Sequence, residues 1–319
     1  MHSLSCVEIC AGAGGQALGL ERSGFEPEAL VEIDPACCNT LRYNRPQWRV
    51  VEGDVRHFDG SRHKGIDLLA GGVPCPPFSK AGKQQGKDDE RDLFPEALRL
   101  VDECRPRAVM LENVRGFLDA VFEEYRANLK RQLERLGYTM DWRLLNASDY
   151  GVSQLRPRAV IVAFRKDLAH GFVWPLPQPQ RPLPVGDLLF DQMAARGWRG
   201  AKAWRKQANG IAPTVVGGSK KHGGPDLGPT RARKAWAELG VDGIGIADQP
   251  PERDFTGMPK LTVPMVARVQ GFPEDWIFTG KKTPAYRQVG NAFPPPVAHA
   301  VSEAIMNCLT QRALYSMAG

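Results

Sequence analysis

Residues 4–15 read LSCVEICAGAGG, and this stretch decides the fold class. Its first seven residues are mostly apolar, as in a buried strand, and they run directly into a turn rich in glycine. A strand that enters a glycine-rich turn is typical of open α/β sheets, in which ligands bind beyond the carboxyl ends of the strands. We therefore interpret this stretch as the first strand and first ligand-binding turn of such a sheet.

Short apolar runs recur along the first half of the chain, with helical stretches between them. The expected strands are Leu4–Cys10, Ala29–Ile33, Trp48–Val51, Ile66–Ala70, Arg107–Leu111, Thr139–Leu145 and Ala159–Arg165. Apolar residues from Leu118 to Leu136 recur at helical spacing ahead of Gly137, which predicts one helix packed on the core. The alternation predicts an α/β fold with a doubly wound, mostly parallel sheet.

The sheet pattern ends near Phe172, where a proline-rich segment, residues 173–184, predicts a stiff linker. Periodicity is then poor up to about Thr283, which predicts a smaller, irregular domain. Prolines 294–296 lead into an amphipathic helix that we expect to fold back on the first domain. We expect one domain from residues 1–172 and 285–319, and a second domain with a hinge from residues 173–284.

Composition places the 319-residue chain among ordinary globular proteins, with 42% hydrophobic residues. Its formal charge of +6 favours an anionic partner. The seven cysteines are scattered and form no C-x-x-C pair, which argues against structural zinc and for a reduced compartment. The strand-like run leaves no room for a signal peptide, and no stretch is long enough to cross a bilayer. We expect a cytoplasmic protein with neither a metal nor a membrane partner.

Polar residues follow the ends of the first five expected strands. After the glycine-rich turn come Glu32-Ile33-Asp34, Gly53-Asp54-Val55, Pro74-Cys75 and Glu112-Asn113-Val114. Five such ends in succession predict a single ligand-binding edge. Glu32 is placed to bind ribose hydroxyls, and Asp54 could accept from an adenine amino group. The edge predicts an adenosine-containing cofactor, and the glycine turn taken alone equally fits a nicotinamide-dependent dehydrogenase.

Cys75 stands in GGVPCPPFS, residues 71–79, immediately after an expected strand. Structural cysteines usually lie inside strands or helices, where they act as small apolar residues. A thiol at a strand exit, in a loop of glycine and proline, can instead meet a substrate as a nucleophile.

The order of these motifs resembles the cytosine-5 DNA methyltransferase family, of the bacterial restriction-modification type. The matching motifs are GGVPC (71–75), ENV (112–114), QLRPR (154–158), VARVQGFP (266–273) and RQVGN (287–291), with residues 10–15 similar to the family's S-adenosylmethionine loop. The resemblance covers residues 4–165 and roughly 262–309. Cys10 holds a place that is commonly Phe, and Pro76 one that is commonly Gln.

The resemblance implies methyl transfer from S-adenosylmethionine to carbon 5 of a flipped-out cytosine in a specific duplex DNA sequence, through a covalent Cys75 adduct. It implies that Glu112 contacts ring nitrogen 3 and the amino group of the base. Arg158, with Arg156 near it, would bind the base carbonyl. The cofactor residues that it implies are Cys10, Gly12, Gly14, Gly15, Glu32, Ile33, Asp54, Val55, Pro74, Leu93, Asn291 and Ala292.

The middle of the chain is expected to be a target-recognition domain that reads DNA. Residues 196–234 hold ten basic residues and one acid, Asp226, a balance that favours contact with phosphates. The expected DNA-binding residues are Lys80, Lys83, Arg199, Arg205, Lys220, Lys221, Arg231, Arg233 and Arg268. The polar stretch 79–91 could close over the extruded base or be an ordinary surface loop. We expect a monomer, beside which a cognate restriction endonuclease could act independently.

Three alternatives stay open at this stage. An RNA cytosine-5 methyltransferase of similar fold would use the same chemistry, although the long segment between the motifs favours a duplex-reading domain. A dehydrogenase leaves Cys75, Glu112 and Arg158 without a role. A catalytically silent DNA-binding regulator would be expected to lack a catalytic residue, and none is missing.

Overall fold

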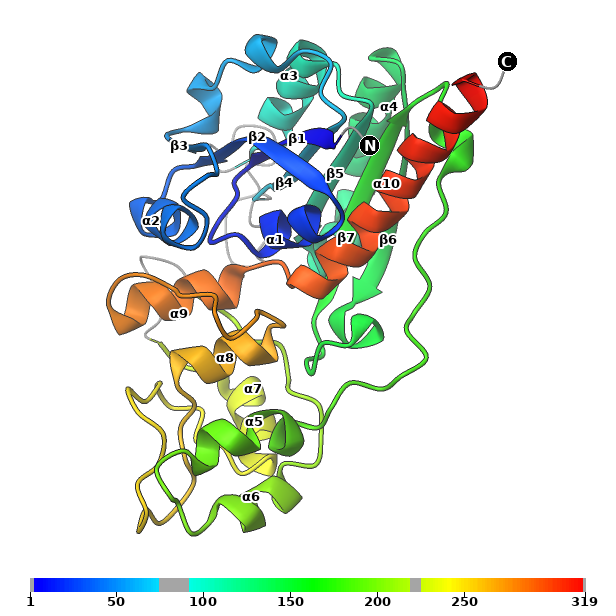
Figure 1. Cartoon of the computed structure of the whole chain (residues 1–319). Helices are drawn as coiled ribbons and strands as arrows, with labels where there is room; N and C mark the ends of the chain where they lie inside the picture. Colours follow the sequence, from blue (N-terminus) through cyan, green and yellow to red (C-terminus); the bar gives the residue numbers. More distant parts are fainter. Residues whose placement is uncertain (1–2, 75–91, 219–224, 318–319) are drawn as a thin grey trace.

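The computed structural model describes residues 3–74, 92–218 and 225–317. They form one seven-stranded sheet in the order β3-β2-β1-β4-β5-β7-β6 (Figure 1). Its strands are β1 (Leu4–Ile9), β2 (Phe25–Glu32), β3 (Val50–Glu52), β4 (Leu68–Gly72), β5 (Ala108–Val114), β6 (Tyr138–Asn146) and β7 (Pro157–Arg165). The pairs from β3 through β5 are parallel, whereas β7 runs antiparallel to both β5 and β6. The predicted mostly parallel α/β sheet is confirmed.

Helices cover both faces of the sheet and form most of the remaining regular structure (Figure 1). The α-helices are α1 (Gly15–Arg22), α2 (Pro35–Asn44), α3 (Phe94–Cys104), α4 (Glu123–Arg135), α5 (Val185–Ala194), α6 (Ala201–Gln207), α7 (Thr230–Glu238), α8 (Val263–Val269), α9 (Lys282–Asn291) and α10 (Pro295–Met317). Short 3-10 turns connect several of them.

Alternate residues of the central strands point to opposite faces, and each face has its own core. On one face, Cys6 and Leu68 are buried in a cluster with α1 and α10. On the other face, their neighbours Val7 and Leu69 are buried in a cluster with α3 and α4. A strand buried on both faces reads as a continuous apolar run, which is why these strands could be located from sequence.

The C-terminal helix α10 packs along α1, although the two are far apart in the chain (Figure 1). Gly19 of α1 allows this close approach, since a Cβ there would lie 2.5 Å from the Ala298 Cβ. The Ser23 hydroxyl lies 2.9 Å from His299 Nδ1 and hydrogen-bonds Ser302 at the same contact. This packing brings the segment before α10 next to the glycine-rich turn.

The expected boundaries differ from the observed ones in every strand, most at the start of β2, which begins at Phe25 and not at Ala29. The helix expected from Leu118 begins only at Glu123, after two short 3-10 turns, so that Val121 is 62% exposed and outside the core. Gly137 follows its C-terminal end with φ +94°, as a helix stop requires. Trp48 is not part of β3, because it lies in the turn after α2, where its backbone N–H donates to the Arg45 carbonyl oxygen at 3.0 Å. Its ring packs against Trp276 with centroids 6.0 Å apart.

Between residues 173 and 284 the described chain carries helices α5–α8 and the start of α9, and isolated bridges are its only β-structure. The proline-rich segment is anchored by Trp174 Nε1, which donates to Asp141 Oδ2 at 2.7 Å. The helices form a third apolar cluster, which also includes Leu18 of α1 and Leu41 of α2. The helical region therefore rests on the sheet domain through apolar contacts. The two-domain division itself stays a prediction.

Candidate active site

A cavity of about 780 Å³ opens at the carboxyl ends of β1, β2, β4 and β5. This volume lies within the roughly 300–1,000 Å³ typical of ligand sites. Of the expected cofactor residues, those that line it are Cys10, Gly12, Gly15, Glu32, Ile33, Asp54, Val55, Pro74, Leu93, Asn291 and Ala292. Glu112 lines it as well. The structure thus brings the strand-end residues together at one edge, as parallel strands should.

The glycine-rich turn gives the cavity its floor. Cys10, Gly12 and Gly14 have φ values of +51°, +56° and +90°, and glycine at the last two avoids the strain of a side chain there. Gly14 does not line the cavity and instead caps the N-terminus of α1. A Cβ on Gly15 would lie 2.2 Å from the carbonyl oxygen of Phe293, so glycine is needed where the C-terminal segment crosses.

Glu32 joins two loops at the cavity. Its Oε2 accepts from the backbone N–H of Gly12 and its Oε1 from that of Asp34, both at 2.7 Å. The side chain is only 8% exposed. A carboxylate can accept about four hydrogen bonds, so these two leave capacity for ribose hydroxyls.

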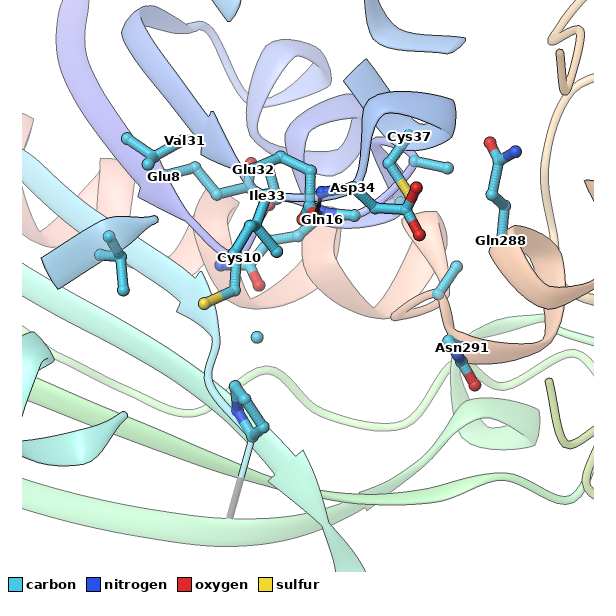
Figure 2. Close-up of a pocket in the computed structure, with 18 of the residues that line it drawn as sticks. Glu8, Cys10, Gln16, Val31, Glu32, Ile33, Asp34, Cys37, Gln288 and Asn291 are labelled. Carbon is cyan, nitrogen blue, oxygen red and sulfur yellow. Dashed lines mark hydrogen bonds between the residues drawn. The ribbon is translucent and has the colours of Figure 1, made fainter. Parts of the chain in front are cut away.

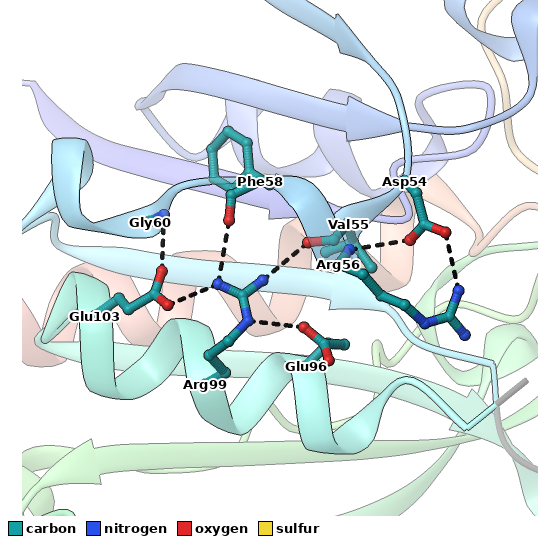
Figure 3. A network of polar contacts seen from close by, with 8 residues as sticks. All are labelled: Asp54, Val55, Arg56, Phe58, Gly60, Glu96, Arg99 and Glu103. Atoms are coloured by element: carbon teal, nitrogen blue, oxygen red, sulfur yellow. Dashed lines mark hydrogen bonds and ion pairs between the residues drawn. The ribbon is translucent and has the colours of Figure 1, made fainter. Parts of the chain in front are cut away.

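Asp54 is held by a polar network at the third strand end (Figure 3). Its carboxylate accepts from the backbone N–H of Arg56 and pairs with the Arg56 guanidinium, each at 2.9 Å. The backbone hydrogen bond from Arg56 is the main reason why the Asp54 pKa lies below its usual value. Arg99 of α3 braces the same loop by donating to the carbonyl oxygens of Val55 and Phe58. The loop is thereby fixed to the helix behind it.

Glu8 and Gln16 are two buried polar residues of the cavity that the sequence analysis did not predict. Glu8 and Gln16 are 1% and 3% exposed and line the cavity close to Glu32 (Figure 2). Glu8 Oε2 and both polar atoms of Gln16 have no hydrogen-bond partner among the described residues. Burial, and secondarily Glu32, raises the pKa of Glu8 well above its usual value. A charged residue inside an otherwise apolar strand was the available signal for Glu8.

The α9 side of the cavity carries further polar groups. Gln288 and Asn291 lie across the cavity from Glu8 (Figure 2). Arg287 also lines it, and its Nε is buried without a partner among the described residues. Cys10 faces the same space, and burial raises the pKa of its thiol to about 12. That thiol stays protonated at neutral pH and is unsuited to act as a nucleophile.

Glu112 and Arg158 form an ion pair on the neighbouring strands β5 and β7. Arg158 Nε lies 2.7 Å from Glu112 Oε1, and the two side chains are only 12% and 13% exposed. Burial raises the pKa of Glu112 despite the opposing charges of Arg158 and Arg156. Asn113 is oriented by its Nδ2, which donates to the carbonyl oxygen of Val73 at 2.9 Å. The predicted catalytic acid therefore lies in a largely buried site at the cavity.

Arg156 does not line the cavity, although a base-binding role was predicted for it. It is 1% exposed and donates to the backbone carbonyl oxygens of Val215, Gly290 and Ala292. All three acceptors belong to the protein itself, and Arg156 is not among the cavity-lining residues. These contacts argue against the expected base-binding role and leave Arg158 as the arginine beside Glu112.

The expected DNA-binding residues have mixed surroundings. Arg199 and Arg205 form exposed ion pairs with Asp254 and Asp187, which DNA phosphates could replace at little cost. Arg231 is exposed on α7, and Arg233 Nη2 donates to the Thr230 hydroxyl at 3.4 Å. The predicted residues Cys75, Lys80, Lys83, Lys220 and Lys221 lie outside the described residues.

Arg268 differs from the other expected DNA contacts. Its guanidinium donates to Asp191 Oδ1 at 2.6 Å and to the Leu188 carbonyl oxygen at 3.0 Å, and also pairs with Glu274. Only 14% of its side chain is exposed. Because these partners already occupy the guanidinium, the structure argues against a DNA contact by Arg268.

None of the described helices combines the length and apolarity that a membrane crossing requires. Within the same part of the chain, no three or more His, Cys, Asp or Glu side chains gather in a way that could hold a metal ion.

The strand order, the antiparallel β7 and the cavity at the strand ends define a methyltransferase fold of the S-adenosylmethionine-dependent class. The methyltransferase EhMeth of Entamoeba histolytica shares this fold, with a TM-score of 0.67 over 97% of this chain and 99% of that one at 15% identity. A family model described as C-5 cytosine-specific DNA methylase matches residues 4–307. The chain therefore belongs to the C-5 cytosine-specific DNA methylase family and is a DNA cytosine-5 methyltransferase.

Curated relatives agree with this membership. The Type II methyltransferase M.NgoMIV of Neisseria gonorrhoeae is 58% identical over 306 residues, covering 95% of this chain and 97% of its own length. The Type II methyltransferase M.NaeI of Lentzea aerocolonigenes is 56% identical over 315 residues, covering 97% of this chain and 76% of its own length. The dehydrogenase alternative, which rested on the glycine turn alone, is wrong.

Proposed function

We propose that this chain transfers a methyl group from S-adenosylmethionine to carbon 5 of a cytosine that has left the DNA duplex, through a covalent Cys75 adduct. The observation that carries the proposal is the buried Glu112–Arg158 pair at the edge of the same cavity as Glu32 and Asp54. The role of Cys75 rests on its motif and on family membership. Gly72 and Pro74, which precede it in sequence, line the cavity.

The nucleophile is needed because carbon 5 of cytosine lies in an aromatic ring and is a poor nucleophile. Addition of the Cys75 thiolate forms a bond from sulfur to carbon 6 and moves the electron pair of the carbon 5–carbon 6 double bond to carbon 5. Once carbon 5 is methylated, its proton leaves to a base. The electron pair then restores the double bond, and the carbon–sulfur bond breaks to release the thiolate.

Glu112 would serve as the proton or hydrogen-bond donor to ring nitrogen 3, where negative charge grows as sulfur adds. A donor must be protonated, and burial raises the pKa of Glu112 in that direction. Arg158 fixes the orientation of the Glu112 carboxyl through its Nε at 2.7 Å. A planar guanidinium also offers further donors, suited to the base carbonyl oxygen.

The cavity fits S-adenosylmethionine, which when bound would supply the methyl group as an electrophile on a sulfonium. Besides Glu112, the carboxyl groups of Glu8, Glu32, Asp34 and Asp54 line the cavity and suit a cationic ligand. Buried polar atoms on Glu8, Gln16 and Arg287 lack partners among the described residues and could bind a charged amino-acid moiety. Ile33 is 63% exposed and offers apolar surface to a base.

The substrate base must leave the helix, because a stacked base cannot present its ring face to a thiol. Extrusion costs a few kcal/mol, and enzymes that modify bases recover it through contacts in the pocket. Basic residues between 196 and 234 would bind the phosphates. We also propose that the chain acts as a monomer. Because its relatives are named type II methyltransferases, we propose that a separate restriction endonuclease acts beside it.

Bisulfite sequencing of plasmid DNA from a methylation-deficient host tests this function. Cells that express the chain should protect cytosines within one short sequence, and Cys75→Ser should abolish protection. Cys308→Ala is the control, because this cysteine of α10 is buried against one face of the sheet, does not line the cavity and should leave the pattern unchanged. Absence of protected cytosines with the unmodified chain would refute the function, and protection by Cys75→Ser would refute the nucleophile.

A further inference from the structure

Arg156 joins segments that are far apart in the chain. Its Nη1 donates to the Val215 carbonyl oxygen at 2.5 Å, and its Nη2 donates to those of Gly290 and Ala292 at 2.9 and 3.0 Å. Val215 lies within the basic middle segment, whereas Gly290 and Ala292 flank the end of α9. One side chain therefore fixes the middle segment to the C-terminal segment.

Two buried amides extend this connection. Gln154 Oε1 accepts from the Val215 N–H at 2.9 Å, and its Nε2 donates to Gln270 Oε1 at 2.8 Å. Gln270 Nε2 in turn donates to the Val289 carbonyl oxygen at 2.8 Å. Gln154 and Gln270 are both fully buried. We call Gln154, Arg156 and Gln270 the polar hub.

Close backbone packing surrounds the polar hub. A Cβ on Gly290 would lie 2.4 Å from the Gly217 Cα, and a Cβ on Gly217 would lie 2.5 Å from Asn291 Oδ1. Asn291 Nδ2 also donates to the Gly218 carbonyl oxygen at 3.3 Å. With so little space, the segment 215–218 cannot shift without moving the end of α9.

The end of α9 is a wall of the cofactor cavity, since Asn291 and Ala292 both line it. The polar hub thus lies between the segment that carries most of the expected DNA-binding residues and that wall. The guanidinium has only backbone carbonyl oxygens as acceptors, and its Nε has no partner among the described residues. Burial accordingly lowers the Arg156 pKa well below its usual value, so this is a costly site for a charge.

We propose that Arg156 is a positioning residue, and that the polar hub couples DNA binding by the middle segment to cofactor binding at the Asn291–Ala292 wall. This proposal rests on the proposed function, because it takes duplex DNA and S-adenosylmethionine as the two ligands. The coupling is reciprocal, since each ligand must strengthen the binding of the other by the same factor.

The test measures binding of S-adenosylhomocysteine by calorimetry, with and without a duplex that contains the sequence found by bisulfite sequencing. For the unmodified chain we expect the duplex to tighten binding by a factor within the roughly 5–150-fold range typical of coupled sites. Arg156→Met should reduce that factor to below about twofold, because methionine cannot donate to the carbonyl oxygens that Arg156 joins. Arg156→Lys should give an intermediate factor, because an ammonium can still donate to some of the carbonyl oxygens.

Arg126→Met is the matched control. Arg126 is also buried and also donates to backbone carbonyl oxygens, those of Phe117 and Asp119, but none of the three residues lines the cavity. We expect both Arg126→Met and Arg156→Met to lower the free energy of unfolding. Only Arg126→Met should keep the factor by which the duplex tightens binding of S-adenosylhomocysteine. A coupling factor equal to that of the unmodified chain in folded Arg156→Met, or in Arg156→Lys if the first variant does not fold, would overturn the proposal. The proposal would also be overturned if the unmodified chain methylates DNA but the duplex does not change its affinity for S-adenosylhomocysteine. Absence of methylation would instead refute the proposed function.

Discussion

Arg158 Nε on β7 lies 2.7 Å from Glu112 Oε1 on β5. In the strand register, however, Arg158 pairs with Val114, and Glu112 pairs with Val160. The Arg158 side chain therefore reaches back along β5 to meet the carboxyl at the cavity. Burial raises the Glu112 pKa, and the Arg158 charge acts against that rise. The pKa of the Glu112 carboxyl thus depends on two opposing effects, its burial and the positive charge of Arg158.

Replacement of this arginine should shift the pH dependence of methyl transfer. In Arg158→Met the Glu112 pKa rises further, because the charge that lowers it is gone. If protonated Glu112 is the active form, the alkaline decline of the single-turnover rate should move to higher pH. The rate itself should fall by about 10²–10⁴-fold, as for loss of a group that acts on the base. An unchanged pH profile would mean that the protonation of Glu112 does not control the rate of methyl transfer.

Glu32→Gln should weaken cofactor binding. The carboxylate accepts two backbone N–H groups at 2.7 Å, and an amide cannot accept both through its two ends. The amide also offers one acceptor oxygen instead of two to the ribose hydroxyls, and loss of a hydrogen bond to a charged group costs about 1.5–3 kcal/mol, which corresponds to roughly 10–150-fold in affinity for S-adenosylhomocysteine. Glu28→Gln is the control, since Glu28 pairs with His63 and does not line the cavity. Equal affinities in calorimetry for the two variants would contradict the role of Glu32.

Glu8 should make the ligand-free protein lose stability as pH rises. Its folded-state pKa is raised by burial, so between the unfolded pKa, about 4.3, and the higher folded value the folded state binds more protons. The free energy of unfolding should therefore be highest below that window and fall as pH rises through it. Glu8→Gln should flatten the decline in urea unfolding between pH 4.5 and 8. If the free energy of unfolding of Glu8→Gln falls as steeply with pH as that of the unmodified chain, a group other than Glu8 causes the decline.

The basic middle segment should give DNA binding a salt dependence. Lys220→Gln with Lys221→Gln should reduce the slope of log affinity against log salt by about 1.8, if each lysine neutralises one phosphate. Lys64→Gln with Lys166→Gln removes the same charge from two exposed positions, one before β4 and one after β7, at the ends of these strands away from the cavity. The control pair should leave the slope unchanged, and an equal effect of both pairs would mean that only net charge matters.

The sequence predicted the sheet and the strand-end residues because both follow from local patterns. Buried parallel strands are continuous apolar runs. A residue at the end of a strand, such as Glu32 in β2, or just after one, such as Asp54 after β3, thereby reaches the cavity. Glu8 was missed because its carboxyl reaches the cavity from inside a strand. The local pattern said nothing about its partners.

The roles of Arg156 and Arg268 could not be predicted from sequence for a different reason. The acceptors of Arg156 lie 59 to 136 residues along the chain, and Asp191 lies 77 residues from Arg268. Only the folded structure brings these groups together. Two arginines spaced two apart, at 156 and 158, look alike in sequence, yet one binds carbonyl oxygens in the polar hub and the other binds Glu112.

Covalent attack on the base is tested most directly by a duplex with 5-fluorocytosine at the methylated position, incubated with the enzyme and S-adenosylmethionine. Fluorine at carbon 5 cannot leave as a proton does, so the sulfur–carbon bond should persist and the complex should survive denaturation. Peptide mass spectrometry should then find the modified nucleotide on Cys75. A denaturation-resistant complex at another residue, or none from an enzyme that methylates the unfluorinated duplex, would contradict the account.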